Sequence, residues 1–367
     1  MNIETAILKI TFASVWSKAW PILVAILFFG LIIAIHEFGH FITAKLCKVK
    51  VHEFSIGMGP AIIKKQFGET LYALRLLPVG GYVRMEGEDE ASDDERAFCN
   101  KKPWQKFLIV AAGAFNNLVL GLILVGVMTC STDLIGTRQV HSFHENASSH
   151  ATGLEAGDVI KKINGTRIFS SRDIDYALVR DKDGVYDFVV DRGGETVELH
   201  NVTFEMQEYA EGKNTIIFDF ILVGEHKTVW NVIKTTFMDT ISIARLVWLS
   251  LFDLVTGRYG LNDLSGPVGA VSVVAQVTSE AVSSGAGLEM IVYIMALITI
   301  NIGVFNWLPI PALDGGRLMF IIIEWIRGKP IDSKYEGWVH TIGFILLMIF
   351  MVVITFNDIK NLITGAL

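Results

Sequence analysis

Hydrophobic residues in this 367-residue chain gather into four long runs that are separated by polar stretches. The runs cover residues 20–44, 107–132, 289–314 and 338–357. A helix of about 20 apolar residues crosses a hydrocarbon layer about 30 Å thick. The pattern therefore predicts a polytopic α-helical membrane protein with four transmembrane helices.

A fifth apolar stretch, residues 228–256, carries a charged residue every five to eight positions. These charges are Lys234, Asp239, Arg245 and Asp253. Such a helix is better suited to a membrane surface than to the hydrocarbon interior, so we expect an amphipathic helix at the outer surface. The alternative is an additional span, which would reverse the sidedness of everything that follows it.

Residues 47–106 form a polar loop with a high apolar content. The segments LYALRLL and GYVRM predict paired strands, because glycine and proline residues break the pattern around them. Two interpretations remain open. The strands are either a small β-hairpin that covers a site from below, or a membrane-associated sheet whose free edge pairs with an unwound substrate strand. The acidic run at residues 86–95 predicts a solvated, mobile loop.

The composition agrees with an integral membrane protein, since 51% of the residues are hydrophobic. The net charge of −7 comes without a basic patch interleaved with aromatic residues, which argues against nucleic acid as a partner. Cys47, Cys99 and Cys130 are far apart in the chain, and we expect free thiols. The first apolar run lacks a cleavage site of small residues, so it is expected to remain as an uncleaved span.

Basic residues predict which polar stretches face the cytoplasm. Residues 45–106 carry eleven lysines and arginines, and residues 317–338 add four more. Both loops are therefore expected on the cytoplasmic side. An even number of spans then places both termini, and the polar insert at residues 133–224, outside the cytoplasm.

The most informative motif is HEFGH at residues 36–40, at the end of the first apolar run. His36 and His40 are four residues apart, so on a helix both imidazoles face one metal ion. Glu37 stands one residue round the helix, where its carboxylate reaches a water molecule on that ion. Ionisable groups at this membrane depth are costly and mark function, so the motif predicts a zinc hydrolase site.

A second polar break, NWLPIPALDGG, falls at the end of the third apolar run. Pro309 and Pro311 lack an N–H and interrupt the helix, which delivers Asp314 toward the two histidines. Catalytic zinc keeps three protein ligands and one open position, and His36, His40 and Asp314 would supply the three. Bound zinc lowers the pKa of a water molecule toward 7, and Glu37 would take its proton and pass it to the leaving amine.

Three amides near these motifs have two possible roles each. Asn306 either holds an extended substrate or caps the broken helix. Asn116 and Asn117 are polar residues inside the second apolar run. One of them is expected to face the bundle interior, where it touches either a substrate or only a neighbouring helix.

These patterns divide the chain into seven segments. The first span (1–46) leads to the polar β loop (47–106) and the second span (107–132). A soluble insert (133–224) and an extracytoplasmic amphipathic region (225–288) follow. The third span with its broken helix (289–327) and the fourth span with a short tail (328–367) come last.

Four motifs together resemble the site-2 protease family of intramembrane zinc metalloproteases, most closely the bacterial regulator-of-sigma-E type with a single PDZ domain. They are HEFGH, NWLPIPALDGG, GLEAGDVIKKING at residues 153–165 and LSGPVGA at residues 264–270. The third motif is typical of a PDZ domain, an α+β fold that accepts a peptide as an added strand. The resemblance implies a multi-pass protein of the bacterial inner membrane with its PDZ domain outside.

The resemblance also implies substrates and site residues. Such enzymes cleave the transmembrane segments of single-span proteins such as anti-sigma factors, and can clear remnant signal peptides. By position, it implies zinc ligands at His36, His40 and Asp314, the catalytic base at Glu37, and a substrate cleft at Asn306, Pro309 and Pro311. The second span departs from the family's Gly-Pro-x-x-Asn pattern, because Ala114 follows Gly113. Asn117 stands at the matching asparagine and joins the candidate substrate-binding residues.

Two other functions compete with this interpretation. A membrane-anchored zinc peptidase could act on soluble or surface peptides, although the long apolar run before HEFGH argues against it. A catalytically silent relative could use its PDZ domain and helices only to bind membrane proteins. Such relatives lack a metal ligand or the base, whereas this chain has all four residues.

Overall fold

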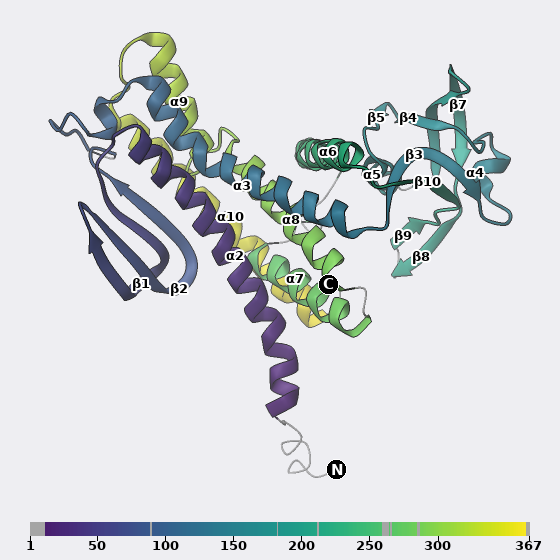
Figure 1. The fold of residues 1–367 in the computed structure, drawn as a ribbon, viewed down its shortest axis with the longest axis horizontal. Helices are drawn as coiled ribbons and strands as arrows, with labels where there is room; N and C mark the ends of the chain where they lie inside the picture. The colour runs from purple at the N-terminus through teal and green to yellow at the C-terminus, as the bar shows by residue number, and fades with distance from the viewer. Residues whose placement is uncertain are drawn as a thin grey trace. The chain divides into compact units, whose positions relative to one another are not determined.

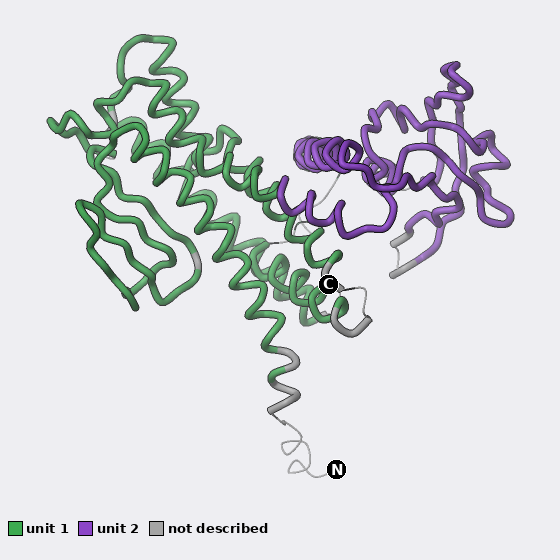
Figure 2. The backbone as a smooth tube through the Cα atoms, viewed as in Figure 1, with its two compact units in different colours: residues 1–121, 253–367 green, residues 122–252 purple. Residues whose placement is uncertain are grey.

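The computed structural model of the chain describes residues 12–88, 90–181, 183–210, 213–258, 264, 266–284 and 287–364. The chain divides into two compact units (Figure 2). One unit holds residues 1–121 and 253–367, and the other holds residues 122–252. Both chain ends, which were expected outside the cytoplasm, lie beyond the described residues.

Among the described residues, four helices are long and apolar enough to cross a membrane, in agreement with the four predicted spans. They are α2 (Phe12–Leu46), α3 (Pro103–Ser131), α8 (Gly287–Asn306) and α10 (Ser333–Thr364) (Figure 1). The last helix is longer than the predicted run and includes most of the expected C-terminal tail. Asp358, far down this helix, is buried and hydrogen-bonded.

The third apolar run is divided into two helices. Helix α8 ends at Asn306, and α9 (Asp314–Arg327) begins at Asp314. Pro309 and Pro311 lie in the connection, where their missing N–H groups prevent a continuous helix. The break places Asp314 on the first turn of a new helix.

The described part of residues 225–284 contains two helices, α6 (Val229–Val255) and α7 (Pro267–Ser284), where one amphipathic helix was expected. Helix α7 packs against α2, α8 and α10, three of the four candidate spans. The carboxylate of Asp358 accepts hydrogen bonds from the Gly266 and Gly269 N–H groups, at 3.1 and 2.8 Å. Helix α7 therefore begins at Pro267, inside the LSGPVGA motif, with a carboxylate at the positive end of the helix.

The loop after α2 contains two long strands, β1 (Val51–Phe67) and β2 (Thr70–Met85), that pair with one another. Residues 53–56 pair with residues 81–84 on one side and with residues 71–74 on the other. Both strands contact α2. Their inner ends join a core with α2, α3 and α9, formed by Phe41, Val51, Val83, Ile109 and Leu318 among others.

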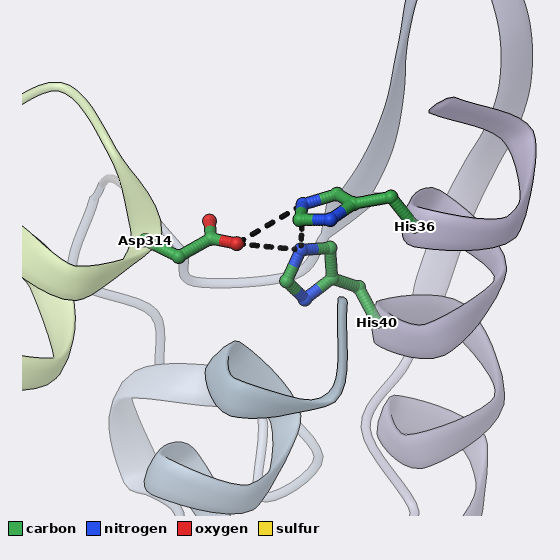
Figure 3. A group of neighbouring side chains, drawn as sticks. All are labelled: His36, His40 and Asp314. Atoms are coloured by element: carbon green, nitrogen blue, oxygen red, sulfur yellow. Dashed lines mark hydrogen bonds and ion pairs between the residues drawn. The ribbon is translucent and has the colours of Figure 1, made fainter. Parts of the chain in front are cut away.

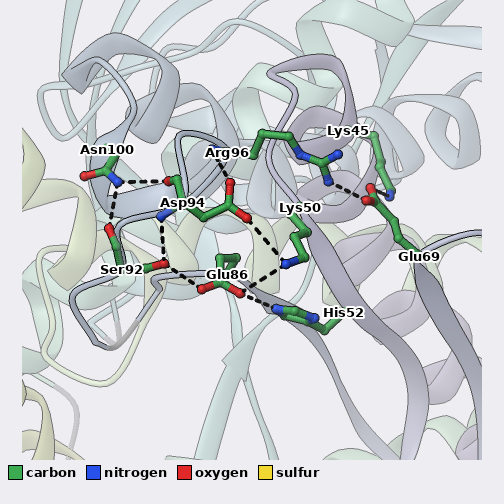
Figure 4. A network of polar contacts seen from close by, with 9 residues as sticks. All are labelled: Lys45, Lys50, His52, Glu69, Glu86, Ser92, Asp94, Arg96 and Asn100. Atoms are coloured by element: carbon green, nitrogen blue, oxygen red, sulfur yellow. Dashed lines mark hydrogen bonds and ion pairs between the residues drawn. The ribbon is translucent and has the colours of Figure 1, made fainter.

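The acidic run at residues 86–95 was predicted as a solvated, mobile loop, and its described residues form turns and irregular structure in which several side chains are hydrogen-bonded. Glu86 accepts hydrogen bonds from Ser92 and His52, both at 2.6 Å, and Asp94 accepts one from Lys50 at 3.4 Å (Figure 4). Ser92 belongs to the run itself, whereas His52 and Lys50 come from the segment after α2, so the sequence of the run does not reveal these two partners. A short helix, η1 (Phe98–Asn100), then leads into α3.

The second unit is built around one sheet with the strand order β10-β3-β4-β6-β7. These strands are β10 (Phe220–His226), β3 (Leu134–Phe143), β4 (Val159–Ile163), β6 (Val185–Arg192) and β7 (Glu195–Thr203). Strand β5 (Thr166–Arg167) pairs with β4, and β8 (Met206–Ala210) pairs with β9 (Lys213–Ile216). Helices α4 (Ser148–Ala151) and α5 (Ser171–Arg180) lie in the same unit.

The GLEAGDVIKKING motif forms the turn before β4, the strand itself and the turn after it. Gly157 has a φ of +98°, a conformation that favours glycine. The Asp158 carboxylate is fully buried and receives two 2.8 Å hydrogen bonds from the Arg192 guanidinium. The motif therefore has a structural role in this sheet, because its aspartate ties the turn to β6.

Helix α6 presents polar residues to its own unit and apolar residues outward. Asp239 and Ser242 are buried, and Asp239 pairs with Arg172 of α5 at 2.9 Å. Arg245 pairs with the fully buried Asp173, also at 2.9 Å. The exposed side is a stripe of large apolar side chains, Trp230, Ile233, Phe237, Ile241, Trp248 and Phe252.

Candidate metal centre

Three potential metal ligands converge at the end of α2 (Figure 3). His36 and His40 lie one helical turn apart, with ring centroids 4.8 Å apart and ring planes at 81°. Asp314, the first residue of α9, faces them. The structure thus brings together the three residues that the two sequence motifs single out.

The distances between the three ligand atoms suit a zinc ion. The two Nε2 atoms are 3.2 Å apart, and Asp314 Oδ2 lies 3.0 Å from His36 Nε2 and 3.3 Å from His40 Nε2. Ligand atoms about 2.0–2.1 Å from a tetrahedral zinc ion are about 3.3 Å from one another. The triangle therefore has the size of one face of a zinc coordination tetrahedron.

The second nitrogen of His40 fixes the tautomer of its ring. His40 Nδ1 lies 2.8 Å from the main-chain oxygen of Ile109, which only accepts hydrogen bonds. Nδ1 must therefore carry the proton, and Nε2 presents a lone pair. This arrangement, a ligand histidine donating its other N–H to a carbonyl, is usual around bound zinc.

Asn117 has the corresponding position beside His36. It is fully buried, its amide is 3.3 Å from His36 Nδ1, and its Oδ1 has no hydrogen-bond partner among the described residues. The oxygen and nitrogen of an amide side chain are assigned from their hydrogen-bond partners. If the Asn117 oxygen is turned toward His36, it accepts the Nδ1–H proton, and both the oxygen and Nδ1 then have a partner. His36 Nε2 then also presents a lone pair.

This hydrogen-bond pattern leaves two lone pairs and one carboxylate oxygen facing one another. Without a cation between them these atoms repel, whereas a divalent metal ion satisfies all three at once. The donor set of two imidazoles and one carboxylate is that of a catalytic zinc site with one open position. The residues present therefore fit zinc.

Close approach of α2 and α3 makes this geometry possible. A Cβ atom at Gly113 would lie 2.3 Å from His40 Nε2 and 2.8 Å from His36 Cε1. A Cβ atom at Gly39 would lie 2.4 Å from the Ala112 oxygen. Asn116 donates a 3.3 Å hydrogen bond to the Ile35 oxygen across the same contact. Of the two adjacent asparagines, Asn116 therefore joins the helices and Asn117 meets the histidine.

Glu37 lines a cavity of about 190 Å³ together with His36, His40 and Asp314. The far wall comes from β2, through Gly81, Tyr82 and Val83. Gly81 is tightly packed, since an added Cβ would lie 2.9 Å from Glu37 Cγ. The end of β2 therefore borders the space beside Glu37.

The residues predicted to bind substrate lie apart from this cavity. Asn306 is the last residue of α8 and is half-buried, Pro309 is exposed, and Pro311 packs near Gly343 of α10. None of the three is among the residues that line the cavity beside Glu37. Asn117 is buried against His36, which favours contact with a neighbouring helix over contact with a substrate.

Known proteins resemble this chain over nearly its whole length. The sequence pattern of peptidase family M50 matches residues 24–350. A Clostridium acetobutylicum relative that carries a zinc metalloprotease name is 37% identical over 338 residues, which are 92% of this chain and 97% of that protein. The regulator of sigma-W protease RasP of Bacillus subtilis is 29% identical over an alignment of 419 positions, which covers 92% of this chain and 97% of RasP. Zinc metalloprotease RasP of Shouchella clausii is 29% identical over an alignment of 427 positions, which covers 93% of this chain and 99% of that protein.

Proposed function

The chain belongs to peptidase family M50 and is a zinc metalloprotease of the site-2 protease type, and on this premise we propose that it cleaves peptide bonds inside transmembrane segments. Its substrates are single-span membrane proteins, among them anti-sigma factors and remnant signal peptides. The name of the B. subtilis relative, a regulator of sigma-W protease, supports the anti-sigma class. The observation that carries the proposal is the convergence of two imidazole lone pairs and one carboxylate beside Glu37.

In this proposal His36, His40 and Asp314 hold the zinc ion. Zinc, when bound, supplies a positive charge that polarises the peptide carbonyl and acidifies a water molecule. The carbonyl of Ile109 and the amide of Asn117 orient the two imidazoles by accepting their Nδ1–H protons. The ligands are then held in place before zinc binds.

Glu37 is the proton carrier. Its carboxylate takes a proton from the attacking water and gives it to the leaving amine, which balances the hydrolysis of one peptide bond. The tight packing of Gly81 against Glu37 Cγ restricts the side chain on the side of β2. A bulkier residue at position 81 would displace either the strand or the base.

The paired strands β1 and β2 offer a route for substrate binding. Gly81, Tyr82 and Val83 line the cavity beside Glu37. The distal parts of both strands expose large apolar side chains, Met58, Ile62, Ile63, Phe67, Leu76 and Leu77. These side chains suit contact with lipid, so the loop is membrane-associated. A substrate unwound from its helix would add to the strands as an extended segment.

The protein is placed in the inner membrane of a bacterium with the polar loop 45–106 in the cytoplasm. The second unit, which we assign as a PDZ domain, then lies outside and restricts access by bulky substrates. The apolar stripe of α6 supports a helix that rests on the outer membrane surface, because its polar residues face its own unit. An additional span would have to bring Asp239 and Arg172 into the hydrocarbon.

The proposal is tested with the purified full chain in detergent and a single-span peptide as substrate. We expect Glu37→Gln to lower kcat by at least about a hundredfold, because the variant keeps the shape of the side chain and loses the base. Bound zinc is measured in parallel and should remain at the level of the parent.

Three outcomes decide between the functions. Cleavage by Glu37→Gln at the rate of the parent would refute the role of Glu37. Cleavage of soluble peptides alone would favour a membrane-anchored peptidase of ordinary substrates. A parent protein that neither binds zinc nor cuts would favour the silent binding module that uses its PDZ domain and helices to hold membrane proteins.

A further inference from the structure

The connection between α8 and α9 has to hold Asp314 in place without the support of a regular helix. Trp307 and Leu308 donate their N–H groups to the Val304 and Phe305 oxygens, at 3.0 Å each. Ile310 and Leu313 donate theirs to the Leu308 and Ile310 oxygens within the connection. Four of the five N–H groups in residues 307–313 thus bond to nearby main chain.

The fifth N–H group, that of Ala312, bonds to a side chain of another helix. It donates a 3.1 Å hydrogen bond to Nδ1 of His340, which lies 28 residues later on α10. Ala312 has a φ of +75°, in the left-handed region that is strained for a residue with a Cβ atom. A strained residue persists only where its surroundings hold it, and His340 is the side chain that does so here.

Residues on either side of His340 on α10 support this contact. Gly343, one turn after His340, faces Pro311, because an added Cβ would lie 2.2 Å from the Pro311 Cβ atom. The same side of α10 therefore touches both residues that precede Leu313. Glu336, one turn before His340, brings its Oε1 to 4.0 Å from His340 Nε2. This carboxylate favours a proton on Nε2 and leaves Nδ1 as an acceptor.

We propose that His340 is a positioning residue that directs Asp314 toward the two histidines by holding the Ala312 N–H in its strained conformation. The inference rests on the proposed role of Asp314 as a zinc ligand. Asp314 follows Ala312 by two residues, and its Oδ2 reaches both imidazoles. A rotation of the Ala312 main chain would swing the start of α9, and with it this oxygen, away from them.

Two substitutions distinguish the role of the His340 hydrogen-bond acceptor from the role of its ring volume. His340→Asn keeps an acceptor at the position of Nδ1 but loses ring volume. His340→Phe keeps the ring, which packs with a centroid 5.7 Å from that of Phe320, and loses the acceptor. We expect His340→Phe to lower zinc affinity and kcat by at least about tenfold, with KM little changed, and His340→Asn to stay within about threefold of the parent.

The readouts are zinc affinity, from competition with a chelator, and the visible spectrum of the cobalt-substituted protein, which reports ligand geometry. Thr341→Ala is the matched control, because among the described residues the Thr341 hydroxyl bonds only within its own helix, to the Gly337 oxygen at 2.8 Å. Greater loss in His340→Asn than in His340→Phe, equal loss in both, or no loss in either would overturn the inference. Asp314→Asn is measured alongside, since zinc loss there upholds the ligand set whatever His340 does.

Discussion

At the scale of single residues, the metal site requires a glycine beside the two histidines. Gly113 of α3 lies directly against both imidazoles, with no space for a methyl group. Its helix also carries Asn117, which reaches His36. The second span therefore shapes the metal site through its backbone and one amide, although it supplies none of the three candidate ligands.

We predict that Gly113→Ala lowers zinc affinity by about tenfold or more, because the new Cβ would lie 2.3 Å from His40 Nε2 and displace the ring. The measurement is competition for zinc with a chelator. Gly126→Ala on the same helix is the control, since its Cβ would meet Thr236 Cγ2 at an ordinary 3.5 Å. Equal zinc affinity in the two variants would contradict the tight contact.

Sequence reasoning works for residues whose role follows from local spacing. His36, Glu37 and His40 share one helical turn, and Asp314 is an acid beside two helix-breaking prolines, so their convergence is predictable. Asn117 and His340 act on partners 81 and 28 residues away. Their contacts depend on how neighbouring helices are rotated, which the spacing of one sequence does not determine.

At the scale of elements, the paired strands are fixed by a buried polar cluster. Glu53 accepts hydrogen bonds from Arg75 at 2.6 Å and from Tyr82 at 2.7 Å. The three residues come from β1 and from two separate parts of β2. The cluster therefore fixes the register in which Tyr82 and its neighbours reach the cavity beside Glu37.

The pKa of Glu53 gives this cluster a defined dependence on pH. Burial raises the pKa of Glu53, but the hydrogen bonds from Tyr82 and Arg75 outweigh burial and hold it below its ordinary value. A carboxyl whose pKa is lower in the folded state stabilises the fold above the unfolded pKa, about 4.3. That contribution is lost as the pH falls through the folded pKa.

We therefore predict that Glu53→Gln destabilises the strand pair by about 1–3 kcal/mol at pH 7. The difference in stability between variant and parent should shrink as the pH falls below about 4.3. Hydrogen exchange of residues 70–85 measures the opening of the strands. Glu69→Gln is the control, because the more exposed Glu69 pairs with Lys45 at the surface and should cost under about 1 kcal/mol. A difference that grew toward acid pH would have the wrong sign.

Hydropathy predicts the elements that are long and uniformly apolar and misses those that are not. The four candidate spans follow from composition alone. Helix α7 was not anticipated as a separate element, because its 18 residues are mostly small and only moderately apolar. Its packing against α2, α8 and α10 depends on contacts between distant segments.

At the scale of the whole molecule, each unit is a self-contained structure with its own core. The buried pairs of Arg245 with Asp173 and of Arg172 with Asp239 make α6 part of the second unit. Removing one partner of a buried ion pair is strongly destabilising, so the apolar stripe of α6 and the sheet are expected to move together.

The three cysteines are free thiols, and their positions before and after the second span have a consequence for chemical labelling. Cys47 follows α2 and Cys99 lies in η1, both in the polar loop that we place in the cytoplasm, whereas the exposed Cys130 lies in the last turn of the second span. A membrane-impermeant maleimide added to intact cells should therefore modify Cys130, and should reach Cys47 and Cys99 only after permeabilisation. Peptide mass spectrometry reads the pattern, with Cys130→Ser as the control. Labelling of Cys99 before Cys130 would invert the proposed sidedness, so the native thiols report topology without any added tag.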